Sequence, residues 1–327
     1  MLNFSILGYG HIGKVHKKAI EETEGAKLIS IIDSKFSGEN PGVPVYGSIR
    51  EFLENDTETD IVSIATPNGY HKQHALECLN AGKHVLIEKP MALNTADAKE
   101  IVEAAQINKK RIFSSMQLRF SPPVRFVKNL IDRNKLGEIY MVNIRCYWNR
   151  NKDYYKQRDW SGSIDMDGGV LFTQFSHFVD IMNFWFDKTN CVHSSFFNFN
   201  HKEVTDFPDS GILEFNADHA KGNMIFTTSV FEKNFKSSIL LIAEKGTVEI
   251  GDQYLNRLIY CNVEGVNPGE ENSTETKNFH PQAMAEIISA IGENRASVLD
   301  GEHAVRLVEF IEGAHRIIKP ETVGNKN

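Results

Sequence analysis

The sequence predicts an α/β protein with two domains. The N-terminal one is a Rossmann domain built on a doubly wound parallel sheet, and the C-terminal one is an α+β domain built on a large, mainly antiparallel open sheet. Three observations predict this fold. Over the first 120 residues, short runs rich in Ile and Val alternate with helical patterns, as in βαβ units. A glycine-rich turn directly follows the first run. After Phe120, longer stretches alternate apolar and polar residues, which favours antiparallel strands with one covered face.

The N-terminal domain is predicted to span residues 1–119. Its strands read as brief, continuous apolar runs, because helices cover both faces of a parallel sheet. We expect these strands at residues 4–7, 28–32, 61–65, 84–87 and 112–116.

The C-terminal domain is predicted to span residues 120–327. It is expected to begin with a helix at residues 126–131 and to end with helices at 281–291 and 301–318, the last of which packs back toward the Rossmann domain. A loop is expected at 265–277 and a frayed tail at 320–327. The expected strands lie at residues 140–148, 194–199, 211–215, 222–229, 238–243 and 247–251.

The composition excludes several classes of protein. A net charge of -7 argues against general nucleic-acid binding, which needs a basic face. No apolar run approaches the roughly 18 residues of a membrane-spanning helix, and the chain starts directly with a strand pattern, so a cytoplasmic location is expected. The four cysteines are widely spaced without a CxxC pair, so neither disulfides nor thiolate metal sites are expected.

The turn after the first strand has the pattern of a dinucleotide site. Its first glycine permits a tight turn, its second a close approach of backbone to a pyrophosphate, and its third close packing of helix on strand. Asp33 ends the next strand, where a carboxylate accepts from ribose hydroxyls and repels a 2′-phosphate. NAD is therefore preferred, although Ser34 and Lys35 leave NADP open. The turn reads Gly8, Tyr9, Gly10, His11, Ile12 and Gly13.

A second cluster lies at the ends of the third and fourth strands, where ligands bind in open parallel sheets. The third strand runs into Thr66, Pro67, Asn68 and His71, and the fourth into Glu88, Lys89 and Pro90. In the second half, Gly168 and Gly169 precede His177 at a GG-x(7)-H spacing. With these motifs in this order, nearly the whole chain resembles the Gfo/Idh/MocA oxidoreductases, named for glucose–fructose oxidoreductase and inositol dehydrogenase.

The resemblance implies catalytic roles for Lys89 and His177. Lys89 would lie between nicotinamide and substrate and move the hydroxyl proton as a hydride leaves carbon. We expect one helix from about Val170 that places Thr173 and His177 on the same face, at i and i+4. Many family members carry Asp where this chain has Thr173. Because a threonine cannot stabilise an imidazolium by charge, Lys89 is expected to carry the proton alone.

The resemblance also implies the contacts of each ligand. We expect no metal, since His71 and His74 lack a third ligand. Cofactor contacts are expected from the glycine turn and from Asp33, Ser34, Thr66, Pro67, Asn68, His71, Glu88, Lys89 and Gln117. Substrate contacts are expected from Lys89, Arg119, Arg158, Trp160, Thr173, Gln174 and His177.

The substrate is expected to be a sugar or sugar nucleotide. The segment around Gln117 and Arg119, the aromatic and basic stretch 148–162 and Thr173 are similar to the family branch that oxidises the 3-hydroxyl of UDP-N-acetylglucosaminuronic acid. Inositol or free-hexose dehydrogenases of the same family, and a non-catalytic dinucleotide sensor, are the alternatives. Since alternating strands leave one sheet face free, a homodimer or homotetramer is expected.

Overall fold

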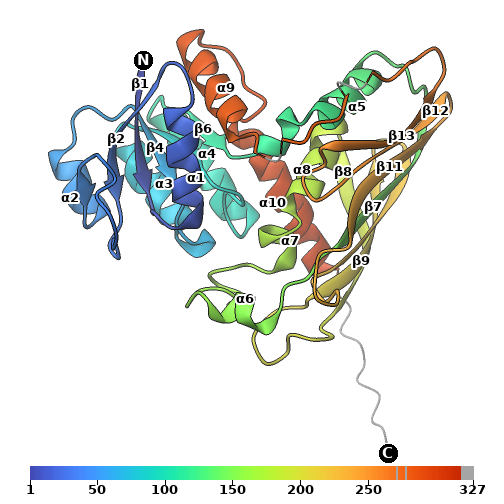
Figure 1. Cartoon of the computed structure of the whole chain (residues 1–327), viewed down its shortest axis with the longest axis horizontal. Helices are drawn as coiled ribbons and strands as arrows, with labels where there is room; N and C mark the ends of the chain where they lie inside the picture. Colours follow the sequence, from blue (N-terminus) through green and yellow to red (C-terminus); the bar gives the residue numbers. More distant parts are fainter. Residues whose placement is uncertain (270–271, 277, 318–327) are drawn as a thin grey trace, which may run out of the picture.

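The computed structural model describes residues 1–269, 272–276 and 278–317. Its two sheets form two lobes, with helices lying between them (Figure 1). The predicted tail at 320–327 and three residues of the predicted loop at 265–277 lie outside the described residues. None of the described helices is both long and apolar enough to cross a membrane.

The first lobe is a parallel six-stranded sheet in the order β3-β2-β1-β4-β5-β6. β4 is buried along its whole length and β1 over its last four residues, because helices cover both faces. The strands are β1 (Leu2–Leu7), β2 (Ala26–Ile32), β3 (Val45–Tyr46), β4 (Ile61–Ile64), β5 (His84–Ile87) and β6 (Ile112–Ser114). The helices are α1 (His11–Glu21), α2 (Ile49–Asn55), α3 (His71–Asn80) and α4 (Thr95–Ile107), with short 3-10 helices η1 (Asn68–Tyr70) and η2 (Gln117–Phe120).

The second lobe is a seven-stranded sheet in the order β13-β12-β11-β7-β10-β9-β8, antiparallel except for the pair β7 and β10. Helices cover one of its faces (Figure 1). The strands are β7 (Ile139–Tyr147), β8 (Thr189–Phe197), β9 (Ser210–Ala217), β10 (Ala220–Thr227), β11 (Lys236–Ala243), β12 (Gly246–Gly251) and β13 (Arg257–Val263). The helices of this half are α5 (Pro122–Asp132), α6 (Lys152–Lys156), α7 (Val170–Thr173), α8 (Ser176–Trp185), α9 (His280–Gly292) and α10 (Gly301–Arg316).

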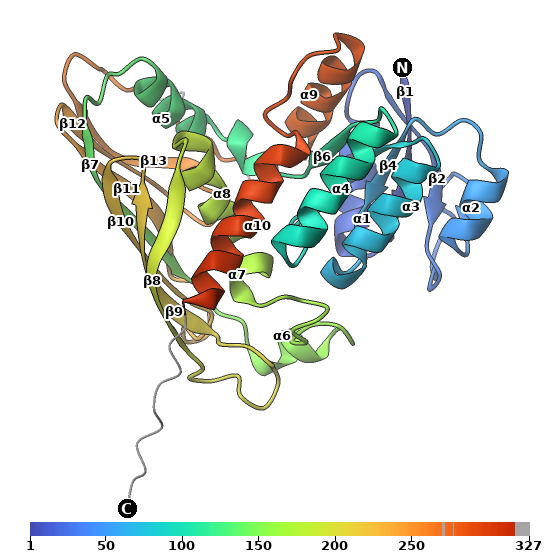
Figure 2. The ribbon, with the colours of Figure 1, turned by 180° about the vertical axis from the view of Figure 1, so that it is seen from behind.

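The two C-terminal helices join the lobes. α10 packs against α4 of the first lobe and against α8 and β8 of the second, and α9 packs against α1 (Figure 2). The side chains of Leu307, Val308 and Ile311 on α10 are completely buried. The last part of the chain thus holds the two sheets in a set orientation around the space between them.

The helix expected to run from Val170 through His177 is broken, so that prediction is wrong. α7 ends at Thr173, and α8 begins at Ser176. Phe175, between them, buries its ring against Trp148 at 5.1 Å and Phe226 at 5.5 Å between ring centroids. Burying this ring on the sheet outweighs the hydrogen bonds that a continuous helix would add.

Candidate active site

The glycine turn packs as tightly as its residue pattern requires. Gly8 has φ +93°, and a Cβ there would lie 2.8 Å from the carbonyl oxygen of Ala65. A Cβ on Gly13 would lie 2.1 Å from the carbonyl oxygen of Gly8. A side chain at Gly13 would push α1 away from β1, and one at Gly8 would push the turn away from the residues after β4, so the tight turn depends on both glycines.

Asp33 lies at the end of β2 and is bonded to the glycine turn itself. Its carboxylate accepts the backbone N–H of Tyr9 at 2.7 Å and that of Lys35 at 2.7 Å. Ser34 beside it is exposed. These contacts place a carboxylate next to the turn, where the sequence predicted a partner for ribose hydroxyls.

Lys89 follows β5 in the first lobe, is partly exposed, and donates from Nζ to the carbonyl oxygen of Thr173 in the second half of the chain at 2.7 Å. Burial lowers the pKa of its ammonium. The charges of Glu88 and Asp167 act in the opposite direction, and the charge of Arg150 adds to the lowering. A lysine with a lowered pKa can exchange a proton at a pH where most lysines cannot.

His177 lies near the start of α8, four residues after Thr173, the last residue of α7. Burial lowers its pKa well below the usual range, and the positive charge of Lys89 acts in the same direction. Its ring is therefore neutral near pH 7. Within the described part of the chain, its buried Nδ1 has no hydrogen-bond partner. A neutral ring with an open nitrogen suits hydrogen bonding to a ligand better than storing a positive charge.

Asp167 is a fully buried carboxylate that the sequence reasoning missed. It accepts hydrogen bonds from the Thr173 hydroxyl and from the backbone N–H of Gly162. Burial raises its pKa, and these hydrogen bonds and the charge of Lys89 oppose the rise. A carboxylate thus lies within electrostatic reach of Lys89 although Thr173 is not an Asp. The only local signal was its place directly before the double glycine.

The segment after β4 connects the two lobes. Asn68 donates from Nδ2 to the carbonyl oxygen of Asp167 at 2.8 Å and to the Thr173 hydroxyl at 3.2 Å. The ring of His71 is buried between the carbonyl oxygens of Pro90 and Thr66, at 2.7 and 2.8 Å from its nitrogens. Of the predicted cofactor contacts, Asn68 therefore has its Nδ2, and His71 both of its ring nitrogens, engaged in the protein. A cavity of about 350 Å³ opens beside Asn68, but neither Lys89 nor His177 lines it.

Arg150 borders the cleft from the end of β7, and its charge acts on Lys89. Its guanidinium lies over the rings of Trp148 at 4.9 Å and Tyr154 at 5.1 Å. It donates to neutral oxygens of Asn149 and Asn234, and none of the described ion pairs includes it. Half-buried and without a described carboxylate partner, it has the character of an anion-binding group.

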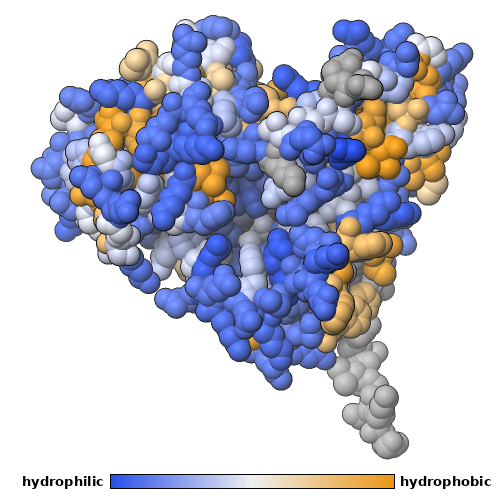
Figure 3. All heavy atoms as spheres, viewed as in Figure 1, coloured by the Kyte–Doolittle hydropathy of each residue, from blue (hydrophilic) through white to orange (hydrophobic). Residues whose placement is uncertain are grey.

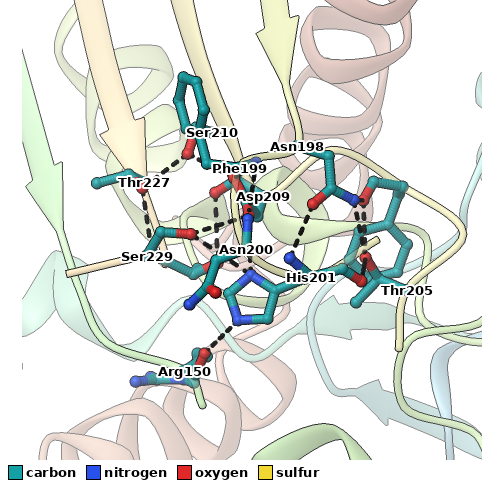
Figure 4. A network of polar contacts seen from close by, with 12 residues as sticks. Arg150, Asn198, Phe199, Asn200, His201, Thr205, Asp209, Ser210, Thr227 and Ser229 are labelled. Atoms are coloured by element: carbon teal, nitrogen blue, oxygen red, sulfur yellow. Dashed lines mark hydrogen bonds and ion pairs between the residues drawn. The ribbon is translucent and has the colours of Figure 1, made fainter. Parts of the chain in front are cut away.

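A polar network holds the backbone of Arg150 in place (Figure 4). The buried His201 lies with Nε2 2.5 Å from the Arg150 carbonyl oxygen and with Nδ1 2.9 Å from a carboxylate oxygen of Asp209. Asp209 also accepts from the Ser229 hydroxyl at 2.8 Å and from the backbone of Asn200 at 2.8 Å. Because these residues come from distant segments, the position of Arg150 is set by the fold around it.

Arg119 does not reach the cleft, so its predicted contact with substrate is corrected. Its side chain is 1% exposed and forms a two-pronged ion pair with Asp180, at 2.9 Å from Nε and 2.5 Å from Nη2. Its third nitrogen donates to the carbonyl oxygen of Val298. All its donor groups face the protein interior, which gives Arg119 a structural role.

The other predicted substrate residues lie on the loop after α6 or beside it. Arg158 is exposed and lies 5.6 Å from the ring centroid of Trp160. Asp159 between them is 3.6 Å from Lys35, so this loop reaches the end of β2. Gln174 is buried and donates to the Tyr154 hydroxyl at 3.1 Å, while its Oε1 has no partner among the described residues.

Two family comparisons cover most of the chain. Residues 2–116 match the oxidoreductase family with an NAD-binding Rossmann fold, and residues 124–249 match the GFO/IDH/MocA C-terminal domain. The chain belongs to the GFO/IDH/MocA family. Its fold class is as the sequence predicted, a Rossmann sheet beside a large, mainly antiparallel sheet.

This GFO/IDH/MocA chain is similar to the WlbA dehydrogenase of Bordetella pertussis, solved in complex with NADH and UDP-GlcNAcA. The TM-score is 0.90 and the identity 28%, over 97% of this chain and 95% of that chain. Two curated relatives are each 28% identical to this chain. One is 1-carboxy-3-chloro-3,4-dihydroxycyclo hexa-1,5-diene dehydrogenase of Comamonas testosteroni, over 58% of this chain and 51% of that protein. The other is glucose-6-phosphate 3-dehydrogenase of Bacillus subtilis, over 58% and 55%. The chain spans about half the length of these curated relatives.

NAD is the cofactor of this family's Rossmann domain, and the residues present fit it. The turn that a Cβ at Gly8 or Gly13 would fill lies at the head of α1, and the carboxylate of Asp33 lies beside it. On η2, the buried acceptor Oε1 of Gln117 has no partner within the described residues. The closely packed backbone of the glycine turn suits a pyrophosphate, and the unpaired Oε1 of Gln117 suits a polar substituent of the nicotinamide ring.

Proposed function

We propose that the protein oxidises a secondary alcohol of a sugar nucleotide with NAD, and that its substrate is a UDP-N-acetyl-hexosaminuronate reacting at the 3-hydroxyl. The observation that carries the anionic substrate is Arg150, a half-buried cation beside Lys89 without a described carboxylate partner. Similarity to a dehydrogenase solved with UDP-GlcNAcA and to a glucose-6-phosphate 3-dehydrogenase supports an anionic sugar and the 3-position.

In the proposed reaction, NAD held by the glycine turn and Asp33 would supply the hydride acceptor for the substrate carbon. The Lys89 amine takes the hydroxyl proton, and the resulting ammonium keeps its hydrogen bond to the Thr173 carbonyl oxygen. His177, neutral and with an open nitrogen, orients the reacting oxygen. The negative charges of Asp167 and Glu88 stabilise the ammonium of Lys89 after it has taken the proton. Arg158 and Trp160 remain proposed contacts at the nucleotide end.

The pH dependence of oxidation should report the amine of Lys89. Because the neutral amine is the active form, kcat/KM is expected to rise with pH and to level off below the usual pKa range of lysine. Asp167→Asn removes a charge that raises this pKa, so the rising limb should move to lower pH. Steady-state rates across pH 5 to 10 check this, and a limb that moves to higher pH in the variant would contradict the assignment.

Arg150→Met is expected to convert substrate preference. We expect wild type to reduce NAD with UDP-GlcNAcA far faster than with UDP-GlcNAc, which has no carboxylate. In the variant, the substrate carboxylate is left without its cationic partner, which is costly for a buried charge. The kcat/KM for the uronate should therefore fall about 100-fold, while the value for UDP-GlcNAc changes little. NADH absorbance measures both, and Arg133→Met, an exposed position on the far end of α5, is the control.

Other outcomes of the same assay identify the alternatives. Turnover of inositol or a free hexose, without turnover of UDP-sugars, would replace the sugar nucleotide as substrate. NADH binding without turnover of any sugar in the panel would indicate a dinucleotide sensor. If Arg150→Met lowers kcat/KM equally for the uronate and for UDP-GlcNAc, Arg150 has a structural role and does not bind the substrate carboxylate.

The second sheet is the proposed surface for self-association. Partly exposed apolar side chains gather over this lobe, the right-hand part of Figure 3. They are Tyr140, Met141, Ile212, Ile242, Ile259 and Tyr260, each at least 39% exposed. Because one sheet face is otherwise bare, we expect a homodimer or homotetramer. Light scattering at micromolar concentration checks this, and a monomer would contradict it.

A further inference from the structure

His280, the first residue of α9, has a ring whose protonation can be read from its contacts. The side chain is buried at 8% exposure, and its Nδ1 lies 2.6 Å from Oδ1 of Asn278. That same Oδ1 accepts the backbone N–H of His280 at 3.1 Å, which identifies it as the carbonyl oxygen of the amide. Nδ1 must therefore carry the proton and donate. In a neutral ring, Nε2 is then left as an acceptor.

A second acceptor faces this nitrogen. Oε1 of Glu88 lies 3.9 Å from Nε2 of His280 and already accepts from Nε2 of His16 at 2.7 Å. Burial alone would raise the pKa of Glu88, but the His16 hydrogen bond and the surrounding charges lower it, so the carboxylate is ionised. Burial lowers the pKa of His280 to about 4, so its ring is neutral. Neither group supplies a proton to the other.

Two buried acceptors at this separation call for a donor between them. Among the described residues, Nε2 of His280 has no hydrogen-bond partner. Leaving such an atom unpaired is unfavourable, so native proteins usually pair it with another group. A group with two N–H bonds and no charge would satisfy both acceptors at once, and a primary amide is such a group.

The pair lies close to the residues of the proposed reaction centre. Glu88 directly precedes Lys89, and both Lys89 and His280 are near enough to His177 to influence its pKa. α9 also packs against η2, which contains Gln117 and its open Oε1. The acceptors are therefore next to the lysine beside which the nicotinamide ring is expected.

We propose that Nε2 of His280 and Oε1 of Glu88 bind the carboxamide NH₂ of the nicotinamide. His280 is then a cofactor-binding residue supplied by the C-terminal part of the chain, and it helps set which face of the ring meets the substrate. His16 supports the pair by holding Glu88 through its hydrogen bond, with Ser63 at 2.6 Å from its other nitrogen. Ligand atoms of His16, Glu88 and His280 lie within 4.8 Å of one another, so a metal ion is the competing occupant.

Direct binding measurements test the proposal without a sugar substrate. NADH and its reduced 3-acetylpyridine analogue, in which a methyl group replaces the carboxamide NH₂, are titrated by calorimetry into wild type and His280→Leu. Wild type should bind NADH about tenfold or more tightly than the analogue. His280→Leu should lose most of that preference by weakening NADH alone. His280→Gln, which offers an amide oxygen, should restore part of it, and His315→Leu on α10 is the control.

Three results would overturn the proposal. The first is a wild type that binds both dinucleotides equally, and the second is a variant that weakens both to the same extent. The third is NADH affinity that is lost after dialysis against EDTA and restored by Zn²⁺, which would assign the three side chains to a metal. If His280→Leu does not fold by circular dichroism, the comparison of His280→Gln with wild type decides. None of these results depends on which sugar the enzyme oxidises.

Discussion

Replacing Lys89 by alanine is expected to lower kcat for alcohol oxidation by about 10³-fold or more, within the range of a lost general base. The amine is the proposed proton acceptor. Among the described residues, Lys89 alone donates a side-chain hydrogen bond to the Thr173 carbonyl oxygen, so no second base occupies this place. NADH affinity should change little, because the glycine turn and Asp33 lie at the other end of the site. Stopped-flow NADH formation and NADH fluorescence measure the two quantities.

The control for this experiment is Lys72→Ala. Lys72 on α3 pairs with Asp97 at 2.6 Å and Glu100 at 2.7 Å, outside the proposed reaction centre. Its removal should leave the rate near that of wild type. Added methylamine should partly restore Lys89→Ala, since a small amine can occupy the space of the missing group. A near-wild-type rate in Lys89→Ala would refute the role of this residue.

Removing the carboxylate of Asp180 should destabilise the protein by about 3–5 kcal/mol, because it leaves the guanidinium of Arg119 buried without its counter-charge. The exposed fractions of the two side chains are 1% and 0%, so water cannot replace the lost partner. Asp180→Ala should therefore shift the denaturant midpoint strongly or prevent folding. Urea unfolding followed by circular dichroism measures the change.

Asp132→Ala is the matched control for Asp180→Ala. Asp132 pairs with Lys128 one turn away on the exposed side of α5, and its side chain is 54% exposed. Such a surface pair contributes about 0.3–0.5 kcal/mol. Equal effects of the two variants on unfolding would mean that Arg119 is not the buried anchor that its contacts indicate.

Most of the Rossmann sheet was predictable because its signals are local. Five predicted strands correspond to β1, β2, β4, β5 and β6, since a strand covered on both faces needs a continuous apolar run. β3 and β13 were missed. β3 has only two residues, and β13 at the edge of the second sheet exposes Arg257 and Ile259, so neither has the pattern of a buried strand.

The same contrast holds in the candidate site. Lys89 and Glu88 were found because they end a predicted strand, and parallel strands end at one edge of the sheet. Arg119 was misplaced, because its distance in sequence from Asp180 hides their ion pair. The helix through Thr173 and His177 was wrong, because helical spacing does not reveal that Phe175 turns its ring toward the second sheet.

The sequence by itself determined the positions of five Rossmann strands along the chain, the glycine turn with Asp33, and the presence of Lys89 at a strand end. Only the tertiary structure decided which polar groups meet there. Asp167, Arg150, His16 and His280 come from four separate segments, and their burial and contacts arise only when segments distant in sequence pack together. The physical reason is range: backbone turns and buried runs are set by near neighbours, whereas pKa values and unpaired acceptors depend on side chains brought together by packing.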